Sequence, residues 1–309
     1  MMTDAPLLIS VPGATLRDAL GPTPDGVDVV VWNLETPAPA PHIDIVVPPY
    51  MGQARHLPAL AGVTTRLIQS QSIGYDDVAG ALPPGHVFAN AATVHETSTA
   101  ELTLALVLAS QRGIPDFVRA ASQGRWAPAR HASLADRRVL LVGFGGVGRA
   151  IEERLVSFEA DVTRVASRAR LDRAGRIHGI DELPQLLPDA EIVIIGVPLT
   201  ESTTRLVDAG FLAALPDGAL VVNIARGKVA DTDAIVAEAA SGRLRFALDV
   251  TDPEPLPDGH PLFALPNVLI SPHVGGASTA MMPRMARLLR QQIERMLHGE
   301  EPLNVVLRS

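Results

Sequence analysis

The chain has 309 residues, 47% of them hydrophobic, and a formal net charge of −8. It can therefore bury a large core and form two domains, and its interspersed charges argue against a nucleic-acid groove. The absence of cysteine excludes disulfides, thiol nucleophiles and cysteine-ligated metals, and Lys228 is the only lysine. The sequence shows no signal peptide and no apolar run near the roughly 18 residues that span a bilayer. We expect a cytoplasmic α/β protein for small molecules, without metal, nucleic-acid or membrane partners.

The first 95 residues read as short apolar strands that alternate with helical or turn segments. Proline and glycine clusters separate these segments. Such alternation favours a parallel sheet with helices on both faces. Because no phosphate-type glycine loop lies here, we expect a small α/β domain that does not itself bind a nucleotide. The expected strands are residues 7–10, 27–32, 43–47, 65–71 and 86–89.

A helix is predicted over residues 98–112, because Ser98 and Glu101 have the spacing of an S-x-x-E capping box. The apolar side chains of this helix lie on nearly all of its faces. A helix of that kind is typically buried between domains or subunits. We therefore expect the chain to cross between two domains here.

The next feature is a dinucleotide-binding fingerprint. An apolar run, residues 139–142, leads into a G-x-G-x-x-G motif formed by Gly143, Gly145 and Gly148. A helical segment and a second apolar run, residues 162–166, follow, which is the strand–turn–helix–strand context that the motif requires. The glycines make the turn, admit a pyrophosphate and allow close packing of helix on strand. The helix N-terminus offers backbone N–H groups to the anion.

The α/β alternation continues to the end of the chain. A last helix, residues 278–297, carries an apolar stripe formed by Met282, Met285, Leu289, Ile293 and Met296, which indicates one buried face. The division that we predict is one domain from residues 1–97 and 278–309, and a nucleotide-binding domain from residues 98–277. The expected strands are 191–196, 219–224, 245–250 and 268–270, and the expected helices are 149–158, 181–187, 208–215 and 231–241.

Polar residues follow several of these strands. Arg226 comes shortly after one strand, Asp249 ends the next, Glu254 lies five residues on, and His273 follows the last. Ligands of doubly wound sheets bind beyond the carboxyl ends of the strands. We therefore expect an arginine, a glutamate and a histidine to converge at one edge of the sheet.

These motifs together resemble the D-isomer-specific 2-hydroxyacid dehydrogenase family, over essentially the whole chain and in the family's order. The fold that the resemblance implies is a Rossmann nucleotide-binding domain inserted in a flavodoxin-like substrate domain, both doubly wound parallel α/β domains. The matching residues are Ile73-Gly74-Tyr75-Asp76, Thr99-Ala100-Glu101, Gly143-Phe144-Gly145-Gly146-Val147-Gly148, Val197-Pro198-Leu199-Thr200, Asn223-Ile224-Ala225-Arg226-Gly227, Ala247-Leu248-Asp249-Val250, Glu254-Pro255, Asn267-Val268-Leu269-Ile270-Ser271-Pro272-His273 and Pro302-Leu303-Asn304-Val305.

The resemblance implies a role for each residue of the site. His273 would protonate the ketone oxygen of a 2-oxo acid as hydride reaches the adjacent carbon, and Glu254 would pair with the imidazolium. Arg226 would orient the substrate and polarise its carbonyl. Backbone N–H groups around Ile73 and Gly74 would hold the substrate carboxylate. The implied cofactor-binding residues are the fingerprint Gly143, Gly145, Gly146, Val147 and Gly148, together with Val197, Pro198, Ile224, Ala225, Asp249 (to the carboxamide), His273 and Gly275.

The sequence departs from NAD-dependent relatives after the second fingerprint strand. Those relatives carry an acid that binds both ribose hydroxyls, and here Ala166 stands in its place, followed by Ser167, Arg168 and Arg170. Hydroxyl and guanidinium groups suit a 2′-phosphate, so NADP is the expected cofactor, with NAD as the alternative. Ser-Arg is similar to the NADPH-dependent glyoxylate/hydroxypyruvate reductase branch. In addition, Glu159 replaces the glycine that usually closes the fingerprint helix.

Other functions remain open at this point. A phosphoglycerate-type dehydrogenase that uses NAD, and a nucleotide-sensing, corepressor-like binding protein, share this scaffold. Formate dehydrogenase pairs its histidine with glutamine, so Glu254 argues against it. We expect a homodimer with the helix after Ser98 near the interface. The sequence does not identify the substrate's side chain or a role for His95 and Glu96.

Overall fold

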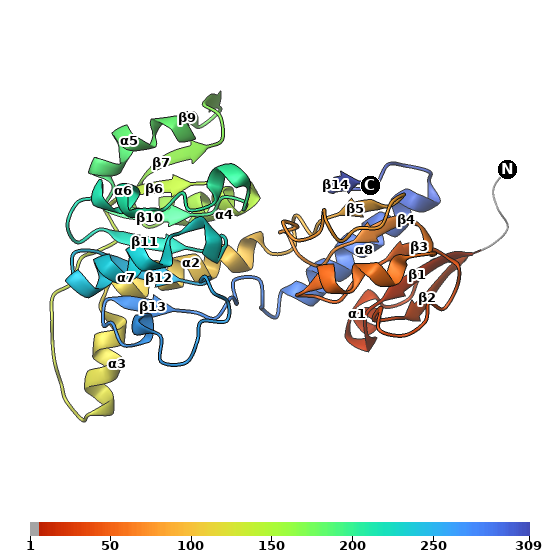
Figure 1. Ribbon diagram of the computed structural model, residues 1–309, viewed down its shortest axis with the longest axis horizontal. Coiled ribbons are helices and arrows are strands. Elements are labelled where there is room, and N and C mark those ends of the chain that lie inside the picture. The colour runs from red at the N-terminus through yellow and green to blue at the C-terminus, as the bar shows by residue number, and fades with distance from the viewer. Residues whose placement is uncertain (1–5) are drawn as a thin grey trace. The chain divides into compact units, whose positions relative to one another are not determined.

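The computed structural model describes residues 6–309, and the chain divides into two compact units (Figure 1). Unit 1 combines the described residues up to His95 with Ser278–Ser309, and unit 2 is Glu96–Ala277. The chain therefore enters unit 2 once and leaves it once, so that unit 2 is an insertion in unit 1.

Unit 1 is built on a six-stranded sheet with the order β14-β5-β4-β3-β1-β2. Neighbouring strands are parallel except β14, which runs antiparallel to β5. The strands are rich in buried aliphatic residues, as expected for a parallel sheet that is covered on both faces. Their bounds are β1 Leu7–Val11, β2 Val27–Val31, β3 His42–Val46, β4 Thr64–Gln69, β5 Val87–Ala89 and β14 Val305–Arg308.

One face of this sheet is covered by α1 (Ala14–Leu20) and α8 (Met281–Leu297), which pack against each other. The helix α8 begins three residues later than predicted, at Met281. Met281 is buried, whereas Met282, predicted to belong to the buried stripe, is only half-buried. The rest of the predicted stripe packs into the core as expected.

Unit 2 is built on an eight-stranded sheet with the order β13-β12-β11-β10-β6-β7-β9-β8. All neighbours are parallel except β8 and β9, which form an antiparallel hairpin. The strand order reverses between β6 and β10, and such a switch point is where doubly wound sheets bind ligands. The bounds are β6 Arg138–Val142, β7 Asp161–Ala166, β8 Arg170–Asp172, β9 Gly175–Gly179, β10 Ile192–Ile195, β11 Leu220–Asn223, β12 Arg245–Leu248 and β13 Val268–Ile270.

Alternate residues of the unit 2 strands face two separate cores. In β6, Val139 and Leu141 pack into the core that contains residues of α2 and α4, whereas Leu140 and Val142 pack into the core that contains residues of α6 and α7. The sheet is therefore buried on both faces, and the predicted α/β fold class is confirmed. The helices are α2 Glu96–Gln111, α3 Ile114–Ser122, α4 Gly146–Val156, α5 Leu183–Leu186, α6 Ala209–Ala213 and α7 Thr232–Ser241.

Two further local predictions need correction, and two elements were missed. The helix α2 begins at Glu96, so Ser98 is a buried residue inside the helix and not its N-cap, since the acidic Glu96 already suits the helix N-terminus. The predicted helix over 181–187 is reduced to α5 with short 3₁₀ turns on either side, where Pro184 and Pro188 each lack an N–H group. The sequence did not predict α3 or the β8–β9 hairpin.

Candidate active site

The fingerprint loop lies between β6 and α4, and its glycines occupy positions that larger residues could not. Gly143 has a φ of +111°, and a Cβ atom there would lie 2.5 Å from the backbone of Gly196. A Cβ at Gly148 would overlap the carbonyl oxygen of Gly143. These two glycines therefore permit the tight turn and the close packing of α4 on the sheet, as predicted.

The second fingerprint glycine, Gly145, faces open space, since a Cβ atom there would meet no heavy atom within 4 Å. It is also the N-cap of α4 and supplies no side-chain acceptor to the helix N–H groups. Gly146 and Val147 begin the helix, and the side chain of Glu96 packs 3.1 Å from the Cβ position of Gly146. The N-terminus of α4 thus has the room and the exposed donors that an anionic pyrophosphate requires.

At the end of α4, Glu159 takes the place of the glycine that the family usually has. It adopts a φ of +59°, in the left-handed region that favours glycine. The N–H of Ala160 donates to the carbonyl of Leu155. The helix therefore ends in the required turn despite the glutamate.

The carboxyl end of β7 presents a short, exposed basic segment. Ala166 is its last residue and is buried, whereas Ser167, Arg168 and Arg170 are exposed. The guanidinium of Arg170 reaches back to the fingerprint loop, where Nη2 donates to the carbonyl of Phe144 at 3.4 Å. In unit 2, cationic and hydroxyl groups thus follow the strand at which NAD-dependent relatives carry an acid.

His273 and Glu254, two of the three residues that the sequence predicted to converge, are in direct contact. The Nδ1 atom of His273 lies 2.5 Å from Oε1 of Glu254. Because a carboxylate only accepts hydrogen bonds, Nδ1 is the donor, and Nε2 is left as the ring nitrogen that can hold or deliver a second proton. The two side chains are about one-third exposed, 31% and 39%, so the pair is accessible to a substrate.

Asp249 holds the loop that carries His273. Its buried carboxylate accepts from the Ser271 hydroxyl (2.6 Å) and the Val274 N–H (2.9 Å) through Oδ1, and from the Gly275 N–H (2.9 Å) through Oδ2. A carboxylate oxygen can accept two hydrogen bonds, so Oδ2 keeps one acceptor position. His273 itself has a φ of +53°, a conformation that costs a non-glycine residue about 1–3 kcal/mol. The Asp249 contacts keep the histidine in this conformation.

Arg226 follows β11 in a turn that the Asn223 side chain stabilises with two hydrogen bonds. The Asn223 side chain accepts from the Ala225 N–H (3.0 Å) and donates to the Arg226 carbonyl (3.1 Å). Arg226 is half-buried, and its Nη1 donates to the Ala225 carbonyl at 2.8 Å. A Cβ at Gly227 would overlap the carbonyl of Thr251, so the Arg226 turn packs directly on the segment that leads to Glu254.

Other predicted cofactor-binding residues lie at the carboxyl ends of β10 and β11. Val197, Ile224 and Ala225 are buried there, and the N–H of Val197 lies 2.8 Å from the Cβ position of Gly143. The carbonyl of Pro198 accepts from the Thr203 hydroxyl at 2.7 Å. These residues therefore border the fingerprint loop at the switch point of the sheet.

Ile73 and Gly74 belong to unit 1, in the loop after β4. Asn90 and Gln53 donate to their carbonyls at 2.9 and 3.2 Å. Within residues 6–309, their backbone N–H groups donate to no protein acceptor. Buried side chains thus orient this loop and leave two donors that suit a carboxylate.

His95 contacts the segment that leads into the same loop. Its Nε2 atom lies 2.6 Å from the carbonyl of Gln71, and its ring stacks on Tyr50 with 5.6 Å between centroids. His95 is 4% exposed. The sequence assigned no role to this histidine, and its contacts make it a support for the segment that ends in Ile73 and Gly74.

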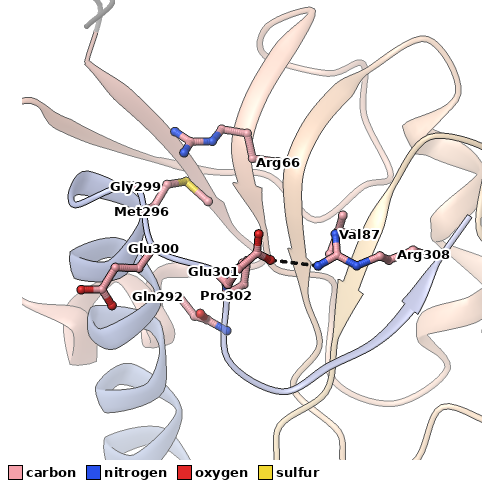
Figure 2. Close-up of a pocket in the computed structure, with 9 residues that line it drawn as sticks. All are labelled: Arg66, Val87, Gln292, Met296, Gly299, Glu300, Glu301, Pro302 and Arg308. Atoms are coloured by element: carbon pink, nitrogen blue, oxygen red, sulfur yellow. Dashed lines mark hydrogen bonds and ion pairs between the residues drawn. The ribbon is translucent and has the colours of Figure 1, made fainter.

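Unit 1 also contains a cavity of about 220 Å³ beside the first residues of β4 and β5 and the end of α8 (Figure 2). Its arginines are engaged by carboxylates: Arg308 pairs with Glu301 at 2.9 Å, and Arg66 with Asp44 at 3.6 Å. Ile73 and Gly74 instead follow the carboxyl end of β4. We therefore do not assign this cavity to the candidate site.

The fold and the site define a dinucleotide-binding α/β protein with a histidine–glutamate pair at the ligand-binding edge of its sheet. Residues 104–275 match the model of the D-isomer specific 2-hydroxyacid dehydrogenase NAD-binding domain. The chain belongs to the D-isomer specific 2-hydroxyacid dehydrogenase family, and its family activity is that of an oxidoreductase. The resemblance seen in the sequence is thereby confirmed.

Known proteins of this family are similar over most of the chain. A glyoxylate reductase from Thermofilum pendens is 32% identical over 253 residues, which cover 78% of this chain and 75% of the relative. A D-isomer specific 2-hydroxyacid dehydrogenase from Xanthobacter autotrophicus Py2, solved with NADPH and MES, has a TM-score of 0.82 at 28% identity and 98% coverage of both chains. An NADPH-dependent glyoxylate/hydroxypyruvate reductase from Sinorhizobium meliloti, solved with NADP and malonate, has a TM-score of 0.79 at 26% identity, covering 98% of this chain and 97% of its own.

Within the described chain, no helix is long and apolar enough to cross a membrane.

Proposed function

We propose that the protein reduces small 2-oxo acids with NADPH, as a reductase of the glyoxylate/hydroxypyruvate type. The observation that carries the proposal is the contact of His273 with Glu254 at the edge of the sheet that bears the fingerprint loop. The matching glyoxylate reductases support this substrate class, and they favour it over a phosphoglycerate-type activity.

The cofactor part of the proposal rests on the segment after β7. NADPH, when bound, supplies the hydride that reaches the substrate's carbonyl carbon. The fingerprint loop and the N-terminus of α4 would hold the pyrophosphate, and Ser167, Arg168 and Arg170 would hold the 2′-phosphate. Asp249 would accept from the carboxamide at the remaining position on Oδ2, and Gly275 would lie beside it. Solved relatives that contain NADPH or NADP support the same assignment, with NAD as a possible second cofactor.

Each proposed site residue would have a separate task in the reaction. The N–H groups of Ile73 and Gly74 would bind the substrate carboxylate, and Arg226 would polarise the ketone. His273 would deliver a proton from Nε2 to the ketone oxygen, while Glu254 stabilises the imidazolium through Nδ1. The product is a 2-hydroxy acid.

A purified sample assayed with glyoxylate and hydroxypyruvate tests the proposal. We expect steady consumption of NADPH with at least one of them, and slower consumption of NADH. A protein that binds NADPH but turns over no 2-oxo acid would instead be a nucleotide-sensing binding protein.

A homodimer and a cytoplasmic location belong to the same proposal. The segment after α2 exposes apolar side chains, with Ile114 47%, Val118 63% and Trp126 96% exposed, and a second copy would bury them. The location follows from a cofactor and substrates that are intracellular metabolites. Sedimentation at micromolar concentration tests the dimer, and a monomer would contradict it.

A further inference from the structure

The β8–β9 hairpin occupies a position in unit 2 that bears on cofactor recognition. It extends the sheet beyond β7, and β8 begins with Arg170, two residues after Arg168. Arg170 and Asp172 are alternate residues of a strand, so both side chains point to the same side of the hairpin. Contacts that hold the Asp172 side chain therefore also determine the side to which the Arg170 side chain points.

The hairpin is tied to the sheet by a buried arginine of β7. Only 7% of the Arg164 side chain is exposed; its Nη1 lies 3.1 Å from Oδ1 of Asp172, and its Nη2 donates to the Ala174 carbonyl at 2.9 Å. Oδ1 of Asp172 also accepts from the N–H of Ala174 at 2.9 Å, which closes the hairpin turn. Asp172 thus links the turn, the edge strand and β7.

Arginines around the hairpin also contact the fingerprint loop. The guanidinium carbons of Arg164 and Arg149 lie 5.4 and 4.9 Å from the ring centroid of Phe144, the residue between the first two fingerprint glycines. Arg149 also lies 3.8 Å from Oδ2 of Asp172. Arg170 contacts the carbonyl of Phe144 from the hairpin side. Hairpin, fingerprint loop and β7 therefore form one connected set of contacts.

Asp172 is ionised at neutral pH. Burial would raise the pKa of Asp172, but the Ala174 N–H and the Arg164 guanidinium outweigh it, so the pKa is lowered. The second acid, Glu152, lies 3.4 Å from Arg164, and burial raises its pKa. With Arg149 and Arg164 against it, the Asp172 carboxylate is neutralised locally and does not oppose an incoming phosphate.

We infer that Asp172 is a positioning residue for the cofactor's 2′-phosphate: through the hairpin it holds Arg170 against the fingerprint loop, so that the phosphate meets an already oriented guanidinium. Asp172 does not itself contact the cofactor. The inference rests on the proposed use of NADP. It explains why Asp172, in a short hairpin of mostly polar sequence, pairs with the buried Arg164 of β7, whereas a flexible loop could expose Arg168 and Arg170 equally well.

Calorimetric titration of the full chain with 2′,5′-ADP and 5′-AMP tests the inference without catalysis, since the two probes differ only in the 2′-phosphate. The variants are Asp172→Asn, Arg170→Ala and the double substitution. A charge-assisted hydrogen bond contributes roughly 1.5–3 kcal/mol, or about ten- to a hundredfold in affinity. Arg170→Ala should weaken the binding of 2′,5′-ADP by about that factor. Asp172→Asn should weaken it by up to the same factor. The double variant should bind 2′,5′-ADP no more weakly than Arg170→Ala alone. Binding of 5′-AMP should not change.

Asp231→Asn is the matched control, because Asp231 also pairs with an arginine, Arg205 at 2.8 Å, and caps α7 in the same unit. It should leave the preference between the probes unchanged. Asp172→Glu, which restores the charge, should recover part of the preference. Equal weakening of both probes by Asp172→Asn, or additive losses in the double variant, would overturn the positioning role. A wild-type protein that binds both probes equally would overturn the proposed use of NADP as well.

Discussion

Nδ1 of His273 lies 2.5 Å from Oε1 of Glu254, and this contact joins the loop after β13 to the loop after β12. It fixes which ring nitrogen faces the carboxylate and leaves Nε2 for proton transfer. Unit 2 contains a second pair of the same kind, His178 and Glu182 at 2.8 Å, in the segment around β9. The second pair supplies controls, because each substitution at His273 or Glu254 can be compared with the same substitution at His178 or Glu182.

His273→Ala should lower kcat by about 10²- to 10⁴-fold, the usual contribution of a general acid. Affinity for NADPH should change far less than kcat, because most of the proposed cofactor contacts come from the fingerprint loop and the segment after β7. Steady-state kinetics and fluorescence titration measure the two effects. His178→Ala is the control and should keep kcat near the wild-type value. A His273→Ala enzyme with nearly full kcat would remove the histidine from the mechanism.

Glu254→Gln should lower kcat for reduction. The carboxylate of Glu254 contacts Nδ1 of His273 and orients the ring that delivers the proton from Nε2. A neutral amide keeps the shape of the side chain but removes the negative charge beside the imidazolium. Steady-state kinetics measure the loss, and Glu182→Gln is the control, because Glu182 pairs with His178. An unchanged kcat would show that Glu254 is not the functional partner.

Gly227→Ala should destabilise unit 2 and impair the site together. The added Cβ would overlap the Thr251 carbonyl, so the turn of Arg226 or the segment before Glu254 must move. Overpacking of this kind costs about 1–3 kcal/mol. Thermal unfolding and kcat/KM measure the two effects. Gly80→Ala is the control, because its Cβ would meet no atom within 4 Å. Equal melting temperatures for the two variants would contradict the steric argument.

Glu191 should stabilise the protein at neutral pH and not in acid. Burial would raise the pKa of Glu191, but the Arg138 N–H and the Arg137 guanidinium at 2.6 Å outweigh it and lower the pKa below the ordinary 4.5. Its contribution is therefore complete above pH 4.5 and is lost as the pH falls through the lowered value. We expect Glu191→Gln to lose about 1 kcal/mol or less at pH 7, with the difference vanishing in acid. Urea unfolding at both pH values measures it, and a constant difference would contradict the linkage.

The sequence predicted the sheets better than the ends of the helices. Strands such as β6 and β10 are continuous aliphatic runs buried on both faces, which is a local signal. The capping pattern at Ser98 was misleading, because the chain is already helical from Glu96. The β8–β9 hairpin lacks an apolar pattern that would predict it. It is tied to β7 by Arg164, whose partners Asp172 and Ala174 are defined only by the folded structure.

The candidate site shows the same division. Arg226, Asp249 and His273 were found because they follow strands, and the structure brings His273 and Glu254 into contact. The residues that hold them were not found. Asn223 fastens the Arg226 turn, and Ser271 bonds to Asp249, but an asparagine or serine after a strand is too common to signal such a role. The Asn223 contacts lie within its own turn, and the Ser271 contact joins the ends of two strands, which a single sequence does not specify.

The most discriminating prediction concerns the exposed Arg168. A 2′-phosphate carries up to two negative charges, which an acid at the end of β7 would repel and Ala166 does not. Ser167 can donate one hydrogen bond to it, and Arg168 can offer a planar, charge-assisted pair with Arg170 nearby. Such bonds contribute roughly 1.5–3 kcal/mol each, so kcat/KM should favour NADPH over NADH by at least about tenfold. Arg168→Ala should remove most of this preference by weakening NADPH alone. Arg176→Ala is the control, because Arg176 lies in the same hairpin but pairs with Glu182 at 2.6 Å. If Arg168→Ala harms both cofactors equally, or if the wild type prefers NADH, Arg168 is a surface arginine and the cofactor assignment is wrong.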